Sequence, residues 1–273
     1  MEGIKLINYF KLELKRAIFS KYFLLSFSII LLLLIYSFFE FISFGWSNNL
    51  FNLQFFKEHY DFIDMFIFSR SENRASYLTV IAPLLASLVF SDSYLSDKTS
   101  GYIKFIYIRI NKKIYVLIRI LVNIIASGLS ILLASLFMLL ILIFFYGIEI
   151  NPENALNMSG AFSSIYYTGN KYVYLLLILI CSFVFNSIFA TLSLSISAFI
   201  NNKYLSFLIP FFYYIISGSI FVAIGFYKLN ATFLFMFKGN MTFLDLLIYA
   251  LFLFISSIIF FAYGVLRKDE KNN

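Results

Sequence analysis

The sequence is poor in the residues that usually build catalytic, metal and redox sites. Its 273 residues include one Cys, one His and one Trp, and only 13% of them are charged. One His cannot supply the His-rich ligand set of an intramembrane metalloprotease, and His59 lies in a loop without the motif of a Ser–His dyad. Cys181 lies inside an apolar run and has no second Cys with which to form a disulfide. We therefore expect no catalytic residue, metal ion or cofactor in this chain.

Two further absences narrow the function. The pattern G-x-x-x-x-G-K-[ST] does not occur, so the chain does not bind ATP through a P-loop. No apolar run carries the inward carboxylates and the Lys or Arg series of an ion-coupled pump, and no Gly-rich loop resembles a channel filter. What remains is a membrane pathway or scaffold that is driven, if at all, by another protein.

Apolar residues, in contrast, are abundant. They make up 62% of the chain, aromatic residues make up 21%, and the mean hydropathy is +0.89. An average soluble protein is ~45–50% apolar, and a membrane-spanning helix needs about 20 apolar residues. The sequence predicts six spans, at residues 22–44, 77–91, 115–146, 172–200, 204–226 and 242–266. The second is short, and residues up to about 95 could supply its missing length.

These runs predict an all-α, polytopic membrane protein with one domain over residues 1–273. No polar segment reaches the ~50 residues of a small soluble domain. The net charge of +7 is carried by Lys and Arg residues beside the spans, which favours contact with membrane lipid over contact with nucleic acid. The high content of Phe, Ile, Asn, Lys and Tyr is typical of a low-GC bacterium, so we expect a bacterial cytoplasmic membrane.

The positive charges predict an orientation. With both chain ends placed in the cytoplasm, the cytoplasmic segments hold 15 of the 21 Lys and Arg residues and the external segments hold 6. Lys and Arg near the end of a span resist translocation. We therefore expect both termini inside.

Residues 1–21 precede the first span and predict a helix that lies in the membrane interface. Apolar residues at helical spacing fall on one face, namely Ile4, Ile7, Phe10, Leu14 and Ile18. The opposite, wet face carries Lys5, Asn8, Glu13, Lys15 and Arg16. Such a helix is either a plain membrane anchor or a contact site for a partner, and the sequence leaves both open.

The external segments and two polar residues of the spans complete the expected architecture. Residues 45–76 form a polar connection, partly helical, that we expect to pack on the outer membrane surface. Residues 227–241 are too short to cross twice, and they predict short re-entrant helices at that surface. Glu40, near the end of the first span, is interpreted as interfacial, with a place on a substrate path as the alternative. Asn123 lies deeper, within the third span.

Residues 92–115 form a basic cytoplasmic connector between the second and third spans. Asp97 stands four positions before Gly101, which allows a sharp turn. Residues 102–109 then predict a short amphipathic helix, and Arg119, in the first turns of the third span, is expected to snorkel to the cytoplasm. A helix of this kind would turn Tyr102, Phe105 and Ile106 toward an apolar partner and leave Lys104 and Arg109 in water. The alternative is a basic loop that binds anionic lipid.

With this layout the chain resembles the membrane permeases of type-2 ABC exporters along essentially its whole length. Such permeases have six spans, both ends in the cytoplasm, an N-terminal interfacial helix, a coupling helix between spans 2 and 3, and short re-entrant helices before span 6. The most specific local match is residues 97–119, with their acidic-to-Gly spacing, amphipathic stretch and basic opening of span 3. Asp97 stands where the family usually has Glu, and residues 110–111 stand where its turn usually has Pro.

The resemblance implies a transport subunit that is not itself an enzyme. Two copies of a separate ABC ATPase subunit would bind ATP and Mg²⁺, and a second permease copy or a homologous permease would complete the membrane part. The cargo would be a hydrophobic or amphipathic substrate, such as an antimicrobial peptide. The alternatives are a non-transporting membrane scaffold or sensor subunit and an ATP-independent channel. The residues implied in ATPase coupling are Asp97, Gly101, Tyr102, Lys104, Phe105, Arg109, Lys112 and Lys113.

Overall fold

The computed structural model describes residues 2–47, 59–72, 77–151, 156, 162–168, 170–236 and 242–268. Six of its helical segments are long and apolar enough to cross a membrane. This confirms the predicted all-α fold with six candidate spans and indicates a multi-pass membrane protein. The spans contain α2 (Lys21–Ser47), α5 (Leu78–Leu88) with α6 (Ser93–Thr99), α8 (Lys112–Tyr146), α10 (Lys171–Ser197), α11 (Lys203–Ile216) with η2 (Ser217–Phe221), and α13 (Phe243–Lys268).

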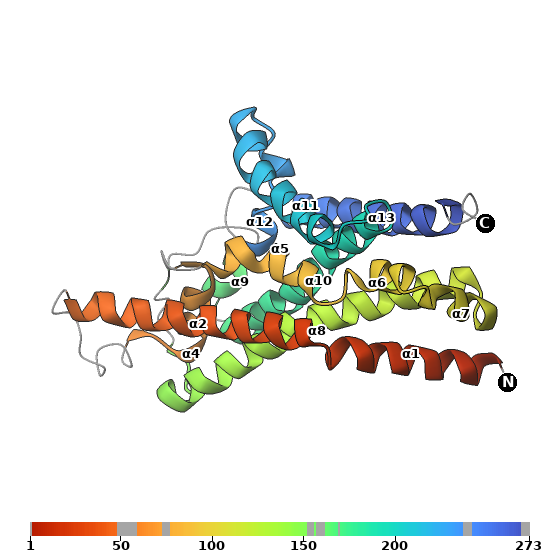
Figure 1. Ribbon diagram of the computed structural model, residues 1–273. Coiled ribbons are helices and arrows are strands. Elements are labelled where there is room, and N and C mark those ends of the chain that lie inside the picture. Colours follow the sequence, from red (N-terminus) through yellow and green to blue (C-terminus); the bar gives the residue numbers. More distant parts are fainter. Residues whose placement is uncertain are drawn as a thin grey trace.

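Shorter helices lie at the two ends of this bundle. Figure 1 shows the N- and C-termini together at one end, which we call the termini end, near α6 and α7; α4 and α9 lie at the opposite end, which we call the loop end. The short elements are α1 (Glu2–Ile18), α4 (Phe62–Ile67), η1 (Phe68–Glu72), α7 (Tyr102–Arg109), α9 (Ser163–Tyr167), η3 (Tyr227–Leu229) and α12 (Phe233–Met236).

Two spans differ from their predicted bounds for local reasons. The second continues to Thr99, because the turn after α5 leads into α6, which buries Tyr94 and Leu95. The third begins at Lys112, because the Asn111 side chain accepts a hydrogen bond from the Lys113 backbone N–H at 2.9 Å and caps the helix.

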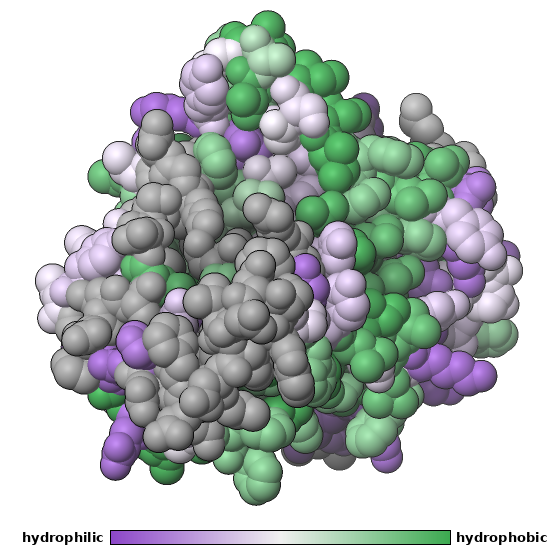
Figure 2. All heavy atoms as spheres, turned by 90° about the vertical axis from the view of Figure 1, so that its left-hand side faces the viewer, coloured by the Kyte–Doolittle hydropathy of each residue, from purple (hydrophilic) through white to green (hydrophobic). Residues whose placement is uncertain are grey.

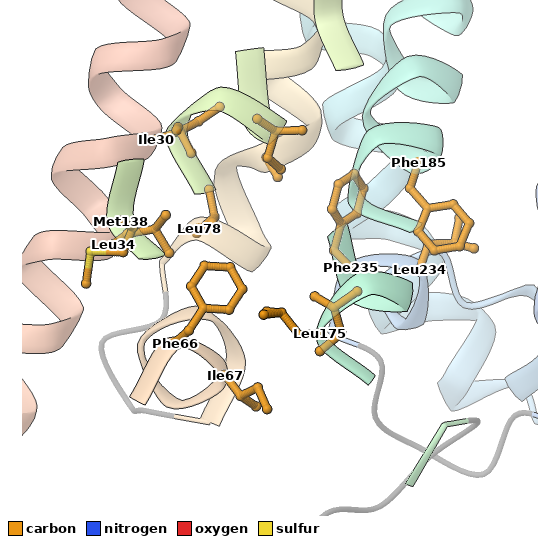
Figure 3. Close-up of a cluster of buried hydrophobic side chains, with 14 of the residues drawn as sticks. Ile30, Leu34, Phe66, Ile67, Leu78, Met138, Leu175, Phe185, Leu234 and Phe235 are labelled. Atoms are coloured by element: carbon orange, nitrogen blue, oxygen red, sulfur yellow. The ribbon is translucent and has the colours of Figure 1, made fainter. Parts of the chain in front are cut away.

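Helices α8 and α10 are the central pair of the bundle. Helix α10 packs against α8, α13, α5 and α11, and α8 also packs against α2, α1 and α4. The two helices approach closely at Gly128, where an added Cβ would lie 2.4 Å from the Phe183 ring. Around them, side chains from α2, α4, α5, α8, α10 and α12 meet in one buried apolar cluster (Figure 3).

Helix α4 lies inside this cluster, which differs from the prediction for the segment 45–76. All six of its residues are at most 3% exposed. Asp64, its one charged residue, is fully buried. Helix α4 is therefore part of the core at the loop end and not a surface layer. Residues 48–58 and 73–76 of the same connection lie outside the described residues.

Helix α1 packs on α8. It runs on beyond α2 in nearly the same direction, along the first turns of α8, and does not turn across the bundle (Figure 1). Its face toward α8 includes Ala17, which is fully buried, and Glu13, which is 5% exposed. The placement of Glu13 on the wet face was therefore wrong.

The segment 227–241 holds two short helices, η3 and α12. Leu234 and Phe235 of α12 are buried, and the Phe235 ring lies 5.5 Å from Phe189 of α10 and 5.7 Å from Tyr214 of α11, measured between ring centroids. Residues 237–241 lie outside the described residues.

The described surface is largely apolar. Phe144 is 86% exposed, Phe252 65% and Leu32 63%. Seen from the loop end, apolar side chains spread over much of the described surface (green in Figure 2). Such exposure suits a surface whose solvent is lipid and not water.

Candidate functional site

A buried ion network at the termini end joins three helices. Arg119 of α8 is 1% exposed, and its Nη1 donates to Oε2 of Glu13 of α1 at 3.0 Å. Its Nη2 donates to the carboxylate of Asp97 of α6 and to the Tyr115 hydroxyl. A lone buried charge costs several kcal/mol, so Arg119 requires these carboxylates as much as they require it. The expectation that Arg119 snorkels to the surface was wrong, because its partners meet it inside the protein.

Arg16 of α1 completes the network from the solvent side. Its Nη2 lies 2.8 Å from Oδ1 of Asp97, and its Nη1 lies 3.6 Å from Oε2 of Glu13. The two oxygens of Asp97 therefore bind two different arginines, one on α1 and one on α8. Two arginines and two carboxylates balance in formal charge, so each buried group lies beside a group of opposite formal charge.

Aromatic rings enclose the guanidinium of Arg119. The rings of Tyr115 and Phe90 lie 5.0 and 5.2 Å from its central carbon, within the range of cation–π attraction. The Tyr9 hydroxyl of α1 is buried beside the same charges, and burial raises the pKa of Tyr9 while the nearby Arg119 acts to lower it. The network thus fixes α1, α6 and α8 to one another through charge and packing together.

Helix α7 projects from this network. Gly101 has φ +73°, a left-handed conformation that favours glycine, and it turns the chain from α6 into α7. Ile103 and Ile106 are buried in a cluster with Tyr94 and Tyr115. Ile106 therefore faces its own bundle, and its predicted orientation toward a partner was wrong.

The opposite face of α7 carries exposed apolar side chains. Tyr102 is 50% exposed, Phe105 66% and Ile108 82%. Their spacing of three residues places them along one side of the helix, and we call them the α7 stripe. Lys104 and Arg109 are exposed beside the stripe.

The eight residues expected in coupling lie in one continuous stretch from α6 to the start of α8, but they divide into two groups. Asp97 points inward to the arginines, and Gly101 shapes the turn. The remaining six lie toward the surface: Lys112, whose Nζ is 5.3 Å from the Tyr107 ring centroid, is half-buried, and the others are exposed. Sequence reasoning missed Arg16 and Arg119 as partners of Asp97, and it missed Glu13 as the second carboxylate that binds Arg119. Their charges near apolar runs were the available signal.

A second buried charge cluster lies at the loop end. Nζ of Lys171, at the start of α10, is 2.8 Å from Oδ2 of Asp61 and 2.8 Å from Oδ2 of Asp64. The Tyr166 hydroxyl donates to Oδ1 of Asp64 at 2.7 Å, and Asp61 caps α4. Burial raises the pKa of Asp64, and the neighbouring charge of Asp61 raises it further. This cluster holds α4 against α9 and α10.

Arg70 is a further buried cation near this end. It is 2% exposed, and its Nη1 donates to the Ser182 hydroxyl in the middle of α10. Burial lowers the pKa of Arg70 to about 10. Within the described part of the chain, no group of three His, Cys, Asp or Glu side chains could hold a metal ion.

Comparison with known proteins does not assign the chain to a family. No protein-family model matches it, and neither a curated protein nor a solved structure does.

Proposed function

We propose that the chain is the membrane permease subunit of an ATP-driven exporter of the type-2 ABC class. The observation that supports this most is the α7 stripe, an apolar face on a short helix that is joined directly to a buried ion network. In this proposal the termini end faces the cytoplasm, in keeping with the distribution of 15 and 6 basic residues between the two sides. The α7 stripe then contacts a separate ATPase subunit.

The ion network gives this contact a route into the spans. Asp97 ends the second span and binds Arg119 of α8 and Arg16 of α1. A displacement of α7 therefore moves α6 together with α1 and α8, unless it breaks the buried ion pairs between them. Because breaking a buried pair costs about 3–5 kcal/mol, small motions of α7 are transmitted and not absorbed.

The ATPase subunits, in two copies, would bind ATP and Mg²⁺ and supply the motion. A second copy of the permease, or a homologous permease, would complete the membrane part. The cargo class that suits the apolar, aromatic-rich spans is a hydrophobic or amphipathic molecule, such as an antimicrobial peptide. The membrane in question is the bacterial cytoplasmic membrane.

Purification from the native host in mild detergent tests the proposal. We expect a P-loop ATPase to accompany the chain in stoichiometric amount, detected by mass spectrometry and by nucleotide hydrolysis. Recovery of only non-ATPase partners in several detergents would instead favour a scaffold or sensor subunit. Conductance of proteoliposomes without nucleotide would favour a channel.

A further inference from the structure

A cavity opens where two spans begin and the second span turns from α5 into α6. Its volume is ≈ 400 Å³. Helices α2 and α11 begin beside it, at Lys21 and Lys203, and the chain leaving α5 reaches it at Asp92. The side chains that matter for its chemistry are Tyr22, Leu88, Asp92, Lys203, Tyr204 and Phe207.

An open charge pair lies at this cavity. Nζ of Lys203 and Oδ2 of Asp92 are 3.7 Å apart, beyond the usual range of a hydrogen bond. The exposed pair Lys228–Asp245 at the other side of the spans is closed, with 2.8 Å between its atoms. Lys203 and Asp92 therefore retain hydrogen-bonding capacity, and their side chains are 47% and 22% exposed.

The surroundings of Lys203 favour an anion. Both helices that begin at the cavity open with the dipeptide Lys-Tyr, and Tyr22, Lys203 and Tyr204 all line it. The N-terminus of α11 adds the positive end of its dipole. Its cap, Asn202, uses the side-chain oxygen to accept from the Tyr204 backbone N–H at 2.9 Å, which leaves the amide N–H₂ as a further donor.

The polarity of the cavity lining also changes along the direction of the spans. Leu88 ends α5, four positions before Asp92, and Phe207 lies one helical turn after Lys203, so both lie further along the spans than the charged pair. Lys203 and the two tyrosines lie where α11 and α2 begin, and in a spanning helix such a position lies near the headgroups. The lining thus changes from polar to apolar in the same direction as a phospholipid.

We propose that this cavity binds a membrane phospholipid with a phosphoethanolamine-type headgroup. The phosphate contacts Lys203 and the hydroxyls of Tyr22 and Tyr204, and the ammonium group contacts Asp92. The first carbons of the acyl chains pack on Leu88 and Phe207. This site does not depend on the transport function proposed above, since any multi-pass membrane protein meets phospholipid.

Native mass spectrometry of the full chain, released from nanodiscs of defined composition, tests the proposal. With phosphatidylethanolamine and phosphatidylglycerol in equal amounts, we expect the wild type to retain phosphatidylethanolamine preferentially. Lys203→Gln should lower retention of both lipids about tenfold, because both carry phosphate. Asp92→Asn should abolish the preference between them, because only the ammonium group needs the carboxylate.

Matched variants keep the result interpretable. Lys228→Gln removes a lysine of the closed pair and should leave retention unchanged, and Tyr204→Phe, at a side chain 72% exposed, should fold normally and lower retention a few-fold. Equal retention by the wild type, Lys203→Gln and Tyr204→Phe would overturn the site. A loss with Lys228→Gln as large as that with Lys203→Gln would show bulk lipid binding and overturn it too. Competition by soluble glycerophosphoethanolamine without any lipid preference would likewise contradict a lipid site.

Discussion

Arg119 of α8 and Glu13 of α1 form an ion pair across 106 positions of the chain, with 3.0 Å between Nη1 and Oε2. Both side chains are nearly inaccessible, at 1% and 6% exposed. The pair attaches the N-terminal helix to the same guanidinium that binds Asp97 at the end of the second span. Arg119 therefore joins α8 to both α1 and α6, and Arg16 links α1 and α6 a second time through Asp97.

We predict that Arg119→Met destabilises the protein by about 3–5 kcal/mol. The substitution keeps much of the side-chain volume but leaves Glu13 and Asp97 buried without their shared cation. The free energy of unfolding in detergent, measured by chemical denaturation, reports the loss. Arg109→Met is the control: it removes an exposed arginine and should change stability by less than about 0.5 kcal/mol.

A triple variant separates lost charge pairing from lost packing. Adding Glu13→Gln and Asp97→Asn to Arg119→Met removes the two carboxylates that the single variant strands, so part of the stability should return. If Arg119→Met alone is as stable as the wild type, the buried network does not hold these helices together.

We predict that Asn123→Leu stabilises the protein. Asn123 is fully buried in α8, and neither its side-chain oxygen nor its side-chain nitrogen has a hydrogen-bond partner among the described residues. A buried polar group without a partner costs about 1–3 kcal/mol, and leucine of similar size avoids that cost. Asn186→Leu is the matched comparison, because Nδ2 of Asn186 donates to the Ser127 carbonyl at 2.6 Å, and its gain should be smaller. Equal changes in unfolding free energy for the two variants would contradict the conclusion that Asn123 is less well hydrogen-bonded than Asn186.

Stability should depend on pH through Asp64. The pKa of this carboxyl group is raised above its ordinary value of 3.8 by burial and by the charge of Asp61. Between the two values the folded protein holds a proton that the unfolded chain has released, so this contribution to stability is present at low pH and is lost as the pH rises. Asp64→Asn, which does not titrate, should lack this part of the slope.

The measurement is the unfolding free energy of both proteins between about pH 4 and pH 7. The difference, wild type minus Asp64→Asn, should shrink as the pH rises. A difference that grows over that range, or stays constant, would show that the carboxyl group has no raised pKa.

We predict that Gly101→Ala costs about 1–2 kcal/mol, entirely through the backbone. Gly101 has φ +73°, and an added Cβ would meet no atom of the described residues within 4 Å, so no clash adds to the cost of the left-handed conformation. Gly101→Asn should cost less, because Asn enters this conformation more readily. Thermal unfolding of the two variants side by side tests the order, and a larger loss for Asn would reverse the explanation.

The sequence was sufficient to predict the spans but not the positions of the buried charged residues. Six runs of about 20 apolar residues have few alternatives to membrane helices, so their number followed from length alone. The position of Arg119 did not follow, because its partners Asp97 and Glu13 lie 22 and 106 positions away. Without knowledge of those contacts, the side chain of a basic residue near a span end is expected to extend into water.

The same lack of information on distant contacts explains why the burial of α4 and the orientation of α7 were not predicted. The segment around Asp61 and Asp64 looked polar enough for the surface, but Lys171, more than 100 positions later, neutralises it inside the bundle. In α7 the amphipathic pattern predicted a helix with an apolar face, yet two apolar faces exist. Ile103 and Ile106 face the bundle, and the α7 stripe faces out.

Site-specific cross-linking from the α7 stripe tests the central claim most directly. A photoreactive residue replaces Phe105 or Ile108 in the native host, and Phe19, an exposed aromatic residue on another segment (76% exposed), serves as the control position. The account predicts that positions 105 and 108 cross-link to a P-loop ATPase and that position 19 does not. If no ATPase is captured from the α7 stripe, or if position 19 captures it equally well, α7 is not the contact through which this protein is driven.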